Sequence, residues 1–318
     1  MASLLLSLRH RESIADRTMA FHFGKPANFQ FIAGQALDLT LITPPHTDAE
    51  DNTRTFTIAS APQDDDIVIA TRLRDTAFKR VLASVPIGPE VQAEGPDGSF
   101  TPHQDVSRPA VFLTGGIGIT PFRSIIRDAV ARKLVHPLWL FYSNNRPEDA
   151  AFLDELQRLA DATPSLHFVP TMTDMAKSRR GWHGDTGFID REMISRRLPF
   201  LGPRYYLAGP PAMVTIMRKM LTAAEVRDAD IQFEEFSGTD ALGKPRSRSS
   251  RLHRRVSLLS CHRPRQRGDH LSAQQPADLR PDLLRADRSR RPDACRRRLH
   301  RRKWKARLAP STKTTRRR

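Results

Sequence analysis

The stretch LTGGIGITPFRSII at residues 113–126 constrains the fold of this chain more than any other. An apolar run ends in three glycines within four positions, and apolar residues at helical spacing follow them. This order predicts a strand, a tight turn and a helix, with Thr120 as the N-cap and Pro121 in the first helical position. The free N–H groups of such a helix start favour a phosphate, and glycines let it approach the main chain.

The glycines alone do not establish a nucleotide site. The dinucleotide fingerprint G-x-G-x-x-G is absent, because Pro121 holds the third glycine position counted from Gly116. A tight strand-to-helix turn without any ligand would need glycines as well. Both interpretations therefore stay open until other parts of the chain are considered.

Charge divides the chain into two unlike parts. The 318 residues carry a formal net charge of +17, but 26 of the 52 Lys and Arg and only 6 of the 35 Asp and Glu lie in residues 239–318. That segment therefore carries +20, and residues 1–238 carry −3. Both cysteines also lie in the basic segment, which excludes a disulfide framework or a cysteine-ligated iron–sulfur cluster within residues 1–238.

Residues 1–238 show two successive patterns. Short strand-like runs with regular Gly and Pro turns over residues 1–106, and one helix near Ala77–Ser84, predict an antiparallel β-barrel domain. Residues 107–238 alternate apolar strands with helices, which predicts a doubly wound parallel sheet. We expect its strands at 110–114, 138–142, 166–170, 204–208 and 230–236, and its helices at 121–133, 147–160, 190–197 and 211–224.

The segment 239–318 has no sustained apolar period. It contains no Ile, Phe, Tyr, Met, Asn or Glu and a single Val, so it cannot bury enough apolar surface to offset the entropy of ordering. We therefore expect an Arg-rich disordered tail. Arg outnumbers Lys 22 to 4 there, which also fits translation out of register in a GC-rich gene. A functional tail of this composition would bind nucleic acid non-specifically, through its phosphates.

A second stretch, RTFTIAS at residues 54–60, carries groups suited to a flat cofactor with a pyrophosphate. The Arg54 fork would pair with phosphates, the Phe56 ring would stack on a heterocycle, and the Thr57 hydroxyl would bond a ring nitrogen. A half-buried strand with alternating faces explains this segment equally well when it is taken alone.

Five motifs in order carry more information than any one of them. They are RTFTIAS at 54–60, EGPDGSF at 94–100, LTGGIGITP at 113–121, YYLAGPPAMV at 205–214 and EEFSG at 234–238. In order and spacing, over residues 1–238, the chain resembles the ferredoxin–NADP reductase superfamily, whose members carry an FAD-binding barrel and an NAD(P)-binding domain. The resemblance implies a flavin domain at 1–106 and an NAD(P) domain at 107–238.

The resemblance also implies roles for particular residues. Thr57, near flavin N5, and Phe236, near the flavin face where nicotinamide docks, are the expected catalytic residues. FAD is the implied flavin, with FMN as the alternative. The implied flavin contacts are Arg54, Phe56, Thr57, Ser60, Ala77, Phe78 and Lys79.

A second set of residues is implied for NAD(P)H. It comprises Gly115, Gly116, Gly118, Thr120, Ser143, Arg146, Gly209, Pro210 and Pro211. The strand at 138–142 is followed by Ser143, two asparagines and Arg146, with no acid among them. An acid there would pair the ribose hydroxyls of NAD, so we expect NADP in preference to NAD.

The implied activity is that of a flavin-dependent NAD(P)H oxidoreductase. Electrons would pass from the flavin to a separate acceptor such as ferredoxin, flavodoxin, or an oxygenase or haem partner. No metal is expected, since hydride transfer needs only two rings held in contact. The alternative is a nucleic-acid-binding protein with a redox-sensing flavin body. No apolar run reaches the roughly 18–20 residues of a membrane span, and we expect a cytoplasmic protein.

Overall fold

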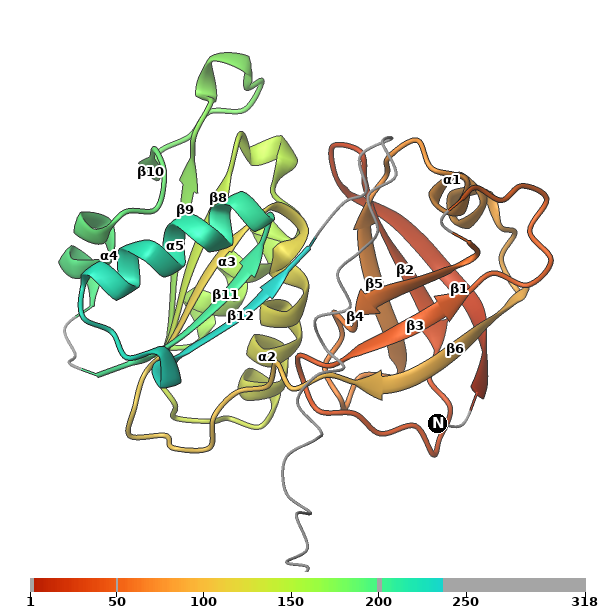
Figure 1. The fold of residues 1–318 in the computed structure, drawn as a ribbon, viewed down its shortest axis with the longest axis horizontal. Helices are drawn as coiled ribbons and strands as arrows, with labels where there is room; N and C mark the ends of the chain where they lie inside the picture. The colour runs from red at the N-terminus through yellow and green to blue at the C-terminus, as the bar shows by residue number, and fades with distance from the viewer. Residues whose placement is uncertain (1–2, 50, 199–201, 237–318) are drawn as a thin grey trace, which may run out of the picture. The chain divides into compact units, whose positions relative to one another are not determined.

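Two six-stranded sheets, one antiparallel and one parallel, make up the structure (Figure 1). The computed structural model describes residues 3–49, 51–198 and 202–236, all of which belong to one compact unit of the chain. The predicted two-sheet fold class is confirmed. The expectation of a disordered tail over 239–318 lies outside the described residues. None of the described helices is long and apolar enough to cross a membrane.

The antiparallel sheet is built from the first part of the chain, drawn in red to orange in Figure 1. Its strands lie in the order β4-β3-β6-β1-β2-β5. One helix, α1, follows β5 and begins and ends where the sequence predicts. The elements are β1 Ser3–Ala15, β2 Thr18–Gly24, β3 Ala36–Thr40, β4 Thr53–Thr57, β5 Asp66–Arg72, α1 Ala77–Ser84 and β6 Glu90–Asp97.

Main-chain and side-chain bonds join the two ends of this sheet into a barrel. Just after β4, the Ala59 N–H donates to the carbonyl of Val68 on β5 at 2.7 Å. The Val68 N–H in turn donates to the Ser60 hydroxyl at 3.0 Å. The interior is apolar at every second strand position, for example Leu37 and Leu39, which are 2% and 0% exposed. The stretch RTFTIAS therefore closes the barrel.

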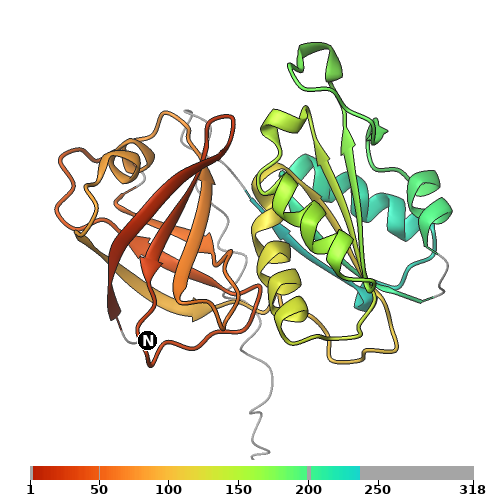
Figure 2. The same cartoon turned by 180° about the vertical axis from the view of Figure 1, so that it is seen from behind.

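The parallel sheet has the order β10-β9-β8-β7-β11-β12. Helices α4 and α5 cover one face (Figure 1), and α2 and α3 cover the other (Figure 2). The elements are β7 Ala110–Gly115, η1 Gly116–Gly118, α2 Ile119–Ala131, β8 Leu138–Asn144, η2 Pro147–Asp149, α3 Leu153–Ala162, β9 Leu166–Met172, η3 Met175–Lys177, β10 Asp185–Thr186, α4 Arg191–Arg197, β11 Arg204–Gly209, α5 Pro211–Ala223, η4 Asp228–Asp230 and β12 Ile231–Glu235.

The helix after the glycines begins earlier than the sequence predicts. The 3-10 turn η1 runs directly into α2, and the last glycine of the turn is the N-cap. Thr120 is therefore not the N-cap. It lies in the first turn of α2, where its hydroxyl donates to the Ile117 carbonyl at 3.2 Å. Pro121 remains compatible with this helix, because first-turn N–H groups have no helical partner.

The helix predicted over residues 147–160 is interrupted. The short turn η2 comes first, and α3 starts only at Leu153. Between them, Phe152 has a φ of 60°, a left-handed conformation that a right-handed helix does not continue. Its ring lies under the guanidinium of Arg123, whose Cζ is 4.2 Å from the ring centre. The prediction was wrong here because no Gly or Pro marks the break.

A histidine anchors the linker between the two sheets. Nε2 of His103 lies 3.0 Å from the Arg108 carbonyl, which only accepts, so this nitrogen carries the proton. Nδ1 therefore accepts from the Tyr206 hydroxyl at 2.8 Å. Burial lowers the pKa of His103, and it also lowers the pKa of His167, whose ring stacks on Trp139.

We predict that His103 lowers the free energy of unfolding in mild acid. Below about pH 6.5 the unfolded chain binds a proton at this histidine, whereas the folded chain keeps it neutral to a lower pH. The free energy of unfolding should therefore fall less steeply on acidification in His103→Gln than in the wild type. Chemical denaturation between about pH 7.5 and about pH 5.5 measures both slopes.

Equal slopes in His103→Gln and the wild type would show that the folded chain accepts this proton as readily as the unfolded chain, contrary to the geometry of the linker.

Candidate functional site

Strand β4 brings three of the predicted flavin residues together. The Arg54 side chain is 12% exposed, and its Nη1 donates to the carbonyls of Asp51 and Thr53, both at 2.8 Å. Its Cζ lies 5.2 Å from the ring centre of Phe78 on α1. The Phe56 ring lies 5.8 Å from the same Phe78 ring. A guanidinium and two aromatic rings thus share one side of the barrel.

A carboxylate already sits at the predicted phosphate position. Asp48 Oδ1 lies 3.3 Å from Arg54 Nη2, and Asp48 Oδ2 accepts the N–H of Ala77, the first residue of α1, at 2.9 Å. An arginine fork and a helix N-terminus are the two groups that hold an oxyanion. Arg54 and the start of α1 therefore form an anion-binding site, the barrel cradle, and the bound Asp48 carboxylate shows that it accepts an oxyanion. Sequence reasoning missed Asp48, although the acidic run TDAED before Arg54 was a visible signal.

Other predicted flavin residues are engaged within the barrel. Thr57 is 4% exposed and Ser60 is fully buried, with its hydroxyl accepting the Val68 N–H. The Lys79 ammonium donates to the carbonyl of Arg72, at the end of β5, at 2.9 Å. The roles of Thr57, Ser60 and Lys79 in cofactor binding stay predictions.

The predicted nucleotide residues meet at one edge of the parallel sheet. Gly115 on β7 pairs with Ser143 on β8, and the neighbouring strand β11 ends at Gly209. Pro210 and Pro211 then begin α5. Nucleotides bind at the carboxyl ends of such parallel strands, so the set lies where a nucleotide would be bound.

The glycines of η1 are needed for two different reasons. A Cβ at Gly118 would lie 2.4 Å from the Ala208 carbonyl oxygen, so the neighbouring turn excludes any side chain there. Gly116 has a φ of +56° and a Cβ there would meet nothing within 4 Å. Gly118 therefore serves packing, and Gly116 borders open space that a ligand can fill.

The last described strand adds an aromatic and an acid to this edge. The Phe236 N–H donates to the Gly209 carbonyl at 2.9 Å. Glu234 pairs across the sheet with Ala208, and burial raises its pKa to about 7. One of its carboxylate oxygens is buried without a hydrogen bond to any described residue. Glu235 is exposed, so Glu234 is the acid of this strand that faces inward.

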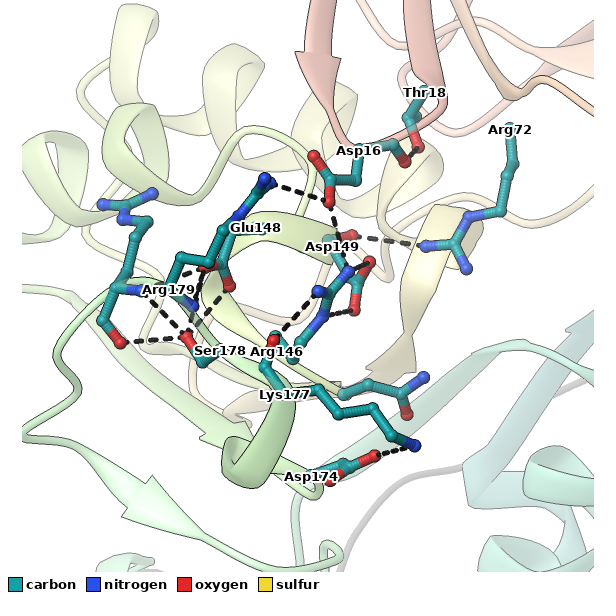
Figure 3. A network of polar contacts seen from close by, with 12 residues as sticks. Asp16, Thr18, Arg72, Arg146, Glu148, Asp149, Asp174, Lys177, Ser178 and Arg179 are labelled. Carbon is teal, nitrogen blue, oxygen red and sulfur yellow. Dashed lines mark hydrogen bonds and ion pairs between the residues drawn. The ribbon is translucent and has the colours of Figure 1, made fainter.

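Arg146 is held by acids, as Figure 3 shows. Its Nε and Nη2 each donate to one carboxylate oxygen of Asp149, both at 2.9 Å, and Nη2 lies 3.2 Å from Asp16 Oδ2. Nη1 donates to the Lys177 carbonyl at 3.1 Å. The hydrogen bonds that Arg146 donates to Asp149 raise the pKa of Arg146. Its predicted contact with a nucleotide phosphate stays a prediction, and such a contact would have to share the guanidinium with this network.

The same network fixes the loop that follows η3 (Figure 3). Burial alone would raise the pKa of Glu148, but the N–H groups of Arg179 and Arg180 and the Ser178 hydroxyl outweigh it and lower the pKa to about 2. The Asp16 N–H donates to the Glu148 carbonyl at 2.7 Å. The tip of the β1–β2 hairpin thus contacts the β8 end of the parallel sheet.

Comparison with known proteins agrees with this arrangement. Residues 112–219 match the family described as an oxidoreductase NAD-binding domain. Ferredoxin–NADP reductase B of Sorangium cellulosum is 27% identical over 213 residues, which cover 64% of this chain and 84% of that protein. The reductase component of phenol 2-monooxygenase from a Pseudomonas species is 28% identical over 236 residues, which cover 73% of this chain and 64% of that protein.

Two solved structures show the same fold. The flavohem-like FAD/NAD-binding domain of nitric oxide dioxygenase from Vibrio cholerae has a TM-score of 0.64 at 19% identity, covering 73% of this chain and 98% of that one. A ferredoxin NADP+ reductase from Neisseria gonorrhoeae has a TM-score of 0.61 at 20% identity, with the same two coverages. Residues 112–219 are thus similar to an oxidoreductase NAD-binding domain, and the two sheets have the fold of these solved structures.

Proposed function

We propose that this chain is a flavin-dependent NAD(P)H oxidoreductase that passes electrons from NAD(P)H through a flavin to a separate acceptor. The observation that carries the proposal is a pair of anion cradles on two different sheets. One is built from Arg54 and the start of α1, and the other is the glycine turn with open space at Gly116. A flavin and a nicotinamide nucleotide each bring a phosphate group to such a cradle.

In the barrel, proposed as a flavin domain over residues 1–106, Arg54 and the α1 N-terminus would hold the flavin phosphates. The partly exposed Phe56 would offer its ring to the flavin and Thr57 its hydroxyl, whereas Phe78 is buried and packs behind Phe56. Bound flavin would supply an acceptor that takes two electrons together and releases them singly. FAD is the proposed form, with FMN as the alternative.

In the parallel sheet, proposed as the NAD(P) domain over residues 107–238, the free N–H groups of η1 and the Gly209 turn would hold the nucleotide pyrophosphate. Phe236 would limit how closely the nicotinamide ring can be placed. Glu234 would add negative charge beside the ring in its ionised form, and a positive charge develops on that ring as hydride leaves. The preference for NADP over NAD rests on Ser143 and Arg146, and parallel titrations with the two nucleotides test it.

The acceptor is proposed to be a separate redox protein. Relatives named as a ferredoxin–NADP reductase and as an oxygenase reductase component support this class of partner. A nucleic-acid function is not proposed, because it rested on residues 239–318, which lie outside the described part of the chain.

Flavin reconstitution tests the barrel cradle. We predict that Arg54→Ala weakens flavin binding roughly 10- to 100-fold, because a charge-assisted bond to phosphate contributes about 1.5–3 kcal/mol. Quenching of flavin fluorescence on titration with apoprotein measures the dissociation constant. Arg9→Ala is the matched control, since this exposed barrel arginine pairs with Asp66 and should leave the affinity unchanged. Equal affinity in Arg54→Ala and the wild type would place the flavin phosphates elsewhere.

Two glycine substitutions test the nucleotide cradle. Gly116→Ala should fold, at a cost of about 1–2 kcal/mol for a left-handed alanine, because its methyl meets open space. It should weaken NAD(P)H binding at least about tenfold while flavin affinity stays constant. Gly118→Ala should instead lower the melting temperature, since its methyl would press on the Ala208 carbonyl.

Steady-state oxidation of NAD(P)H with ferricyanide as acceptor, together with thermal melts, separates these two outcomes. The cradle assignment fails if Gly116→Ala folds and keeps its flavin but shows the wild-type KM for NAD(P)H.

A further inference from the structure

The two proposed cradles are linked by a short path through the chain. Ala59 follows Thr57 on the barrel side by two residues, and Arg123 follows Gly118 on the nucleotide side by five. Arg123 Nη1 donates to the Ala59 carbonyl at 2.8 Å, in a buried hydrogen bond. One contact thus joins the segment that closes the barrel to the helix that starts at the glycine turn.

The guanidinium of Arg123 is held in one orientation. Its Nε donates to Glu155 Oε2 at 2.9 Å, and its Cζ lies 4.2 Å from the centre of the Phe152 ring. Its side chain is only 9% exposed. Because a planar guanidinium uses its edge for two bonds and its face for the ring, little freedom remains to rotate.

Neighbouring residues on α2 reinforce the contact. The Ser124 hydroxyl donates to the Ser60 carbonyl at 2.6 Å. Arg127 pairs with Asp64 of the barrel, with Nη2 and Oδ1 3.0 Å apart. The Asp64 and Arg127 side chains are partly exposed, at 25% and 32%. Arg123 and Ser124 each hold a buried main-chain carbonyl instead, and Arg123 is also held by an acid and an aromatic ring.

We propose that Arg123 is a positioning residue that sets the separation of the flavin-binding segment from the nicotinamide-binding turn. This inference rests on the proposed function. Hydride transfer requires the reacting atoms to approach within about 3–3.5 Å, and a misplacement of about 1 Å can cost about a hundredfold in rate. A bond that fixes α2 against Ala59 therefore governs the rate of transfer without touching either cofactor.

The removal of Arg123 leaves its carboxylate partner satisfied. Glu155 keeps a bond from Arg127 Nη1 at 2.8 Å, so Arg123→Gln does not create an unpaired carboxylate. Lysine at this position can still donate to one acceptor but cannot bond the carbonyl and the carboxylate together in the arginine geometry. Arg123→Lys should therefore restore part of the function that Arg123→Gln loses.

The experiment compares the flavin-loaded full chain and its variants by anaerobic rapid mixing with NADPH and with NADH. Arg123→Gln should lower the limiting rate of flavin bleaching at saturating nucleotide at least about tenfold. The dissociation constants of flavin and nucleotide should stay within about threefold of the wild type. The limiting rate of Arg123→Lys should fall between those of Arg123→Gln and the wild type. Arg158→Gln, which changes an exposed arginine on α3, should match the wild type.

Each other outcome has a definite meaning. A wild-type limiting rate in a folded Arg123→Gln, even with a lower melting temperature, overturns the proposal, and so does a loss of rate fully explained by weaker flavin binding. A wild-type protein that binds flavin but is reduced by neither nucleotide refutes the proposed function instead. Should Arg123→Gln fail to fold, Arg123→Lys replaces it, and an unchanged limiting rate in that variant overturns the proposal.

Discussion

The nucleotide edge depends on how closely two main-chain turns approach each other. The turn after β7 and the turn after β11 lie so near that a Cβ at Gly118 would stand 2.4 Å from the Ala208 carbonyl oxygen. The Thr114 hydroxyl donates to that same oxygen at 2.8 Å, which fixes the two strands in register. Among the three glycines of the turn after β7, Gly115 and Gly118 are closely packed and Gly116 borders open space. The edge that would receive a pyrophosphate is thus shaped first by backbone packing.

The barrel cradle differs from the nucleotide edge, because a side chain of the protein itself, an acid, already lies in it. Asp48 bridges Arg54 and the first N–H of α1, which are the groups proposed for the flavin phosphates. A phosphate entering this cradle would meet a carboxylate of like charge, so Asp48 would have to turn away or share Arg54 with it. The flavin phosphate and the Asp48 carboxylate then compete for one site. Flavin therefore binds more weakly than it would if Arg54 had no carboxylate partner.

Much of this arrangement could be predicted from the sequence, because it depends on local patterns. The alternation of apolar strands with helices located five of the parallel strands, and the helix over Ala77–Ser84 was predicted with its observed bounds. The start of α2 and the break at Phe152 were not predictable. The first depends on a 3-10 turn that feeds the helix, and the second on a left-handed residue stabilised by the tertiary contact with Arg123.

The residues missed by sequence reasoning share one property, which is that their partners are distant in the chain. Arg123 meets a carbonyl 64 residues away, and Asp48 meets a helix start 29 residues away. Arg146 shows the converse, because an arginine placed well for a phosphate by sequence is bound in the fold by Asp149 and Asp16. The type of a side chain and its place relative to a strand predict its position in the fold. Its hydrogen-bond partners depend on which distant segments the fold brings beside it.

Direct hydride transfer between the two proposed cofactors can be followed in a single turnover. The flavin-loaded chain is mixed without oxygen with NADPH or NADH that carries deuterium at the transferred position of nicotinamide C4, and the flavin absorbance is followed. We expect the flavin to be bleached in a single turnover and the deuterium to slow the bleaching. A bound flavin that stays oxidised with both nucleotides would contradict it.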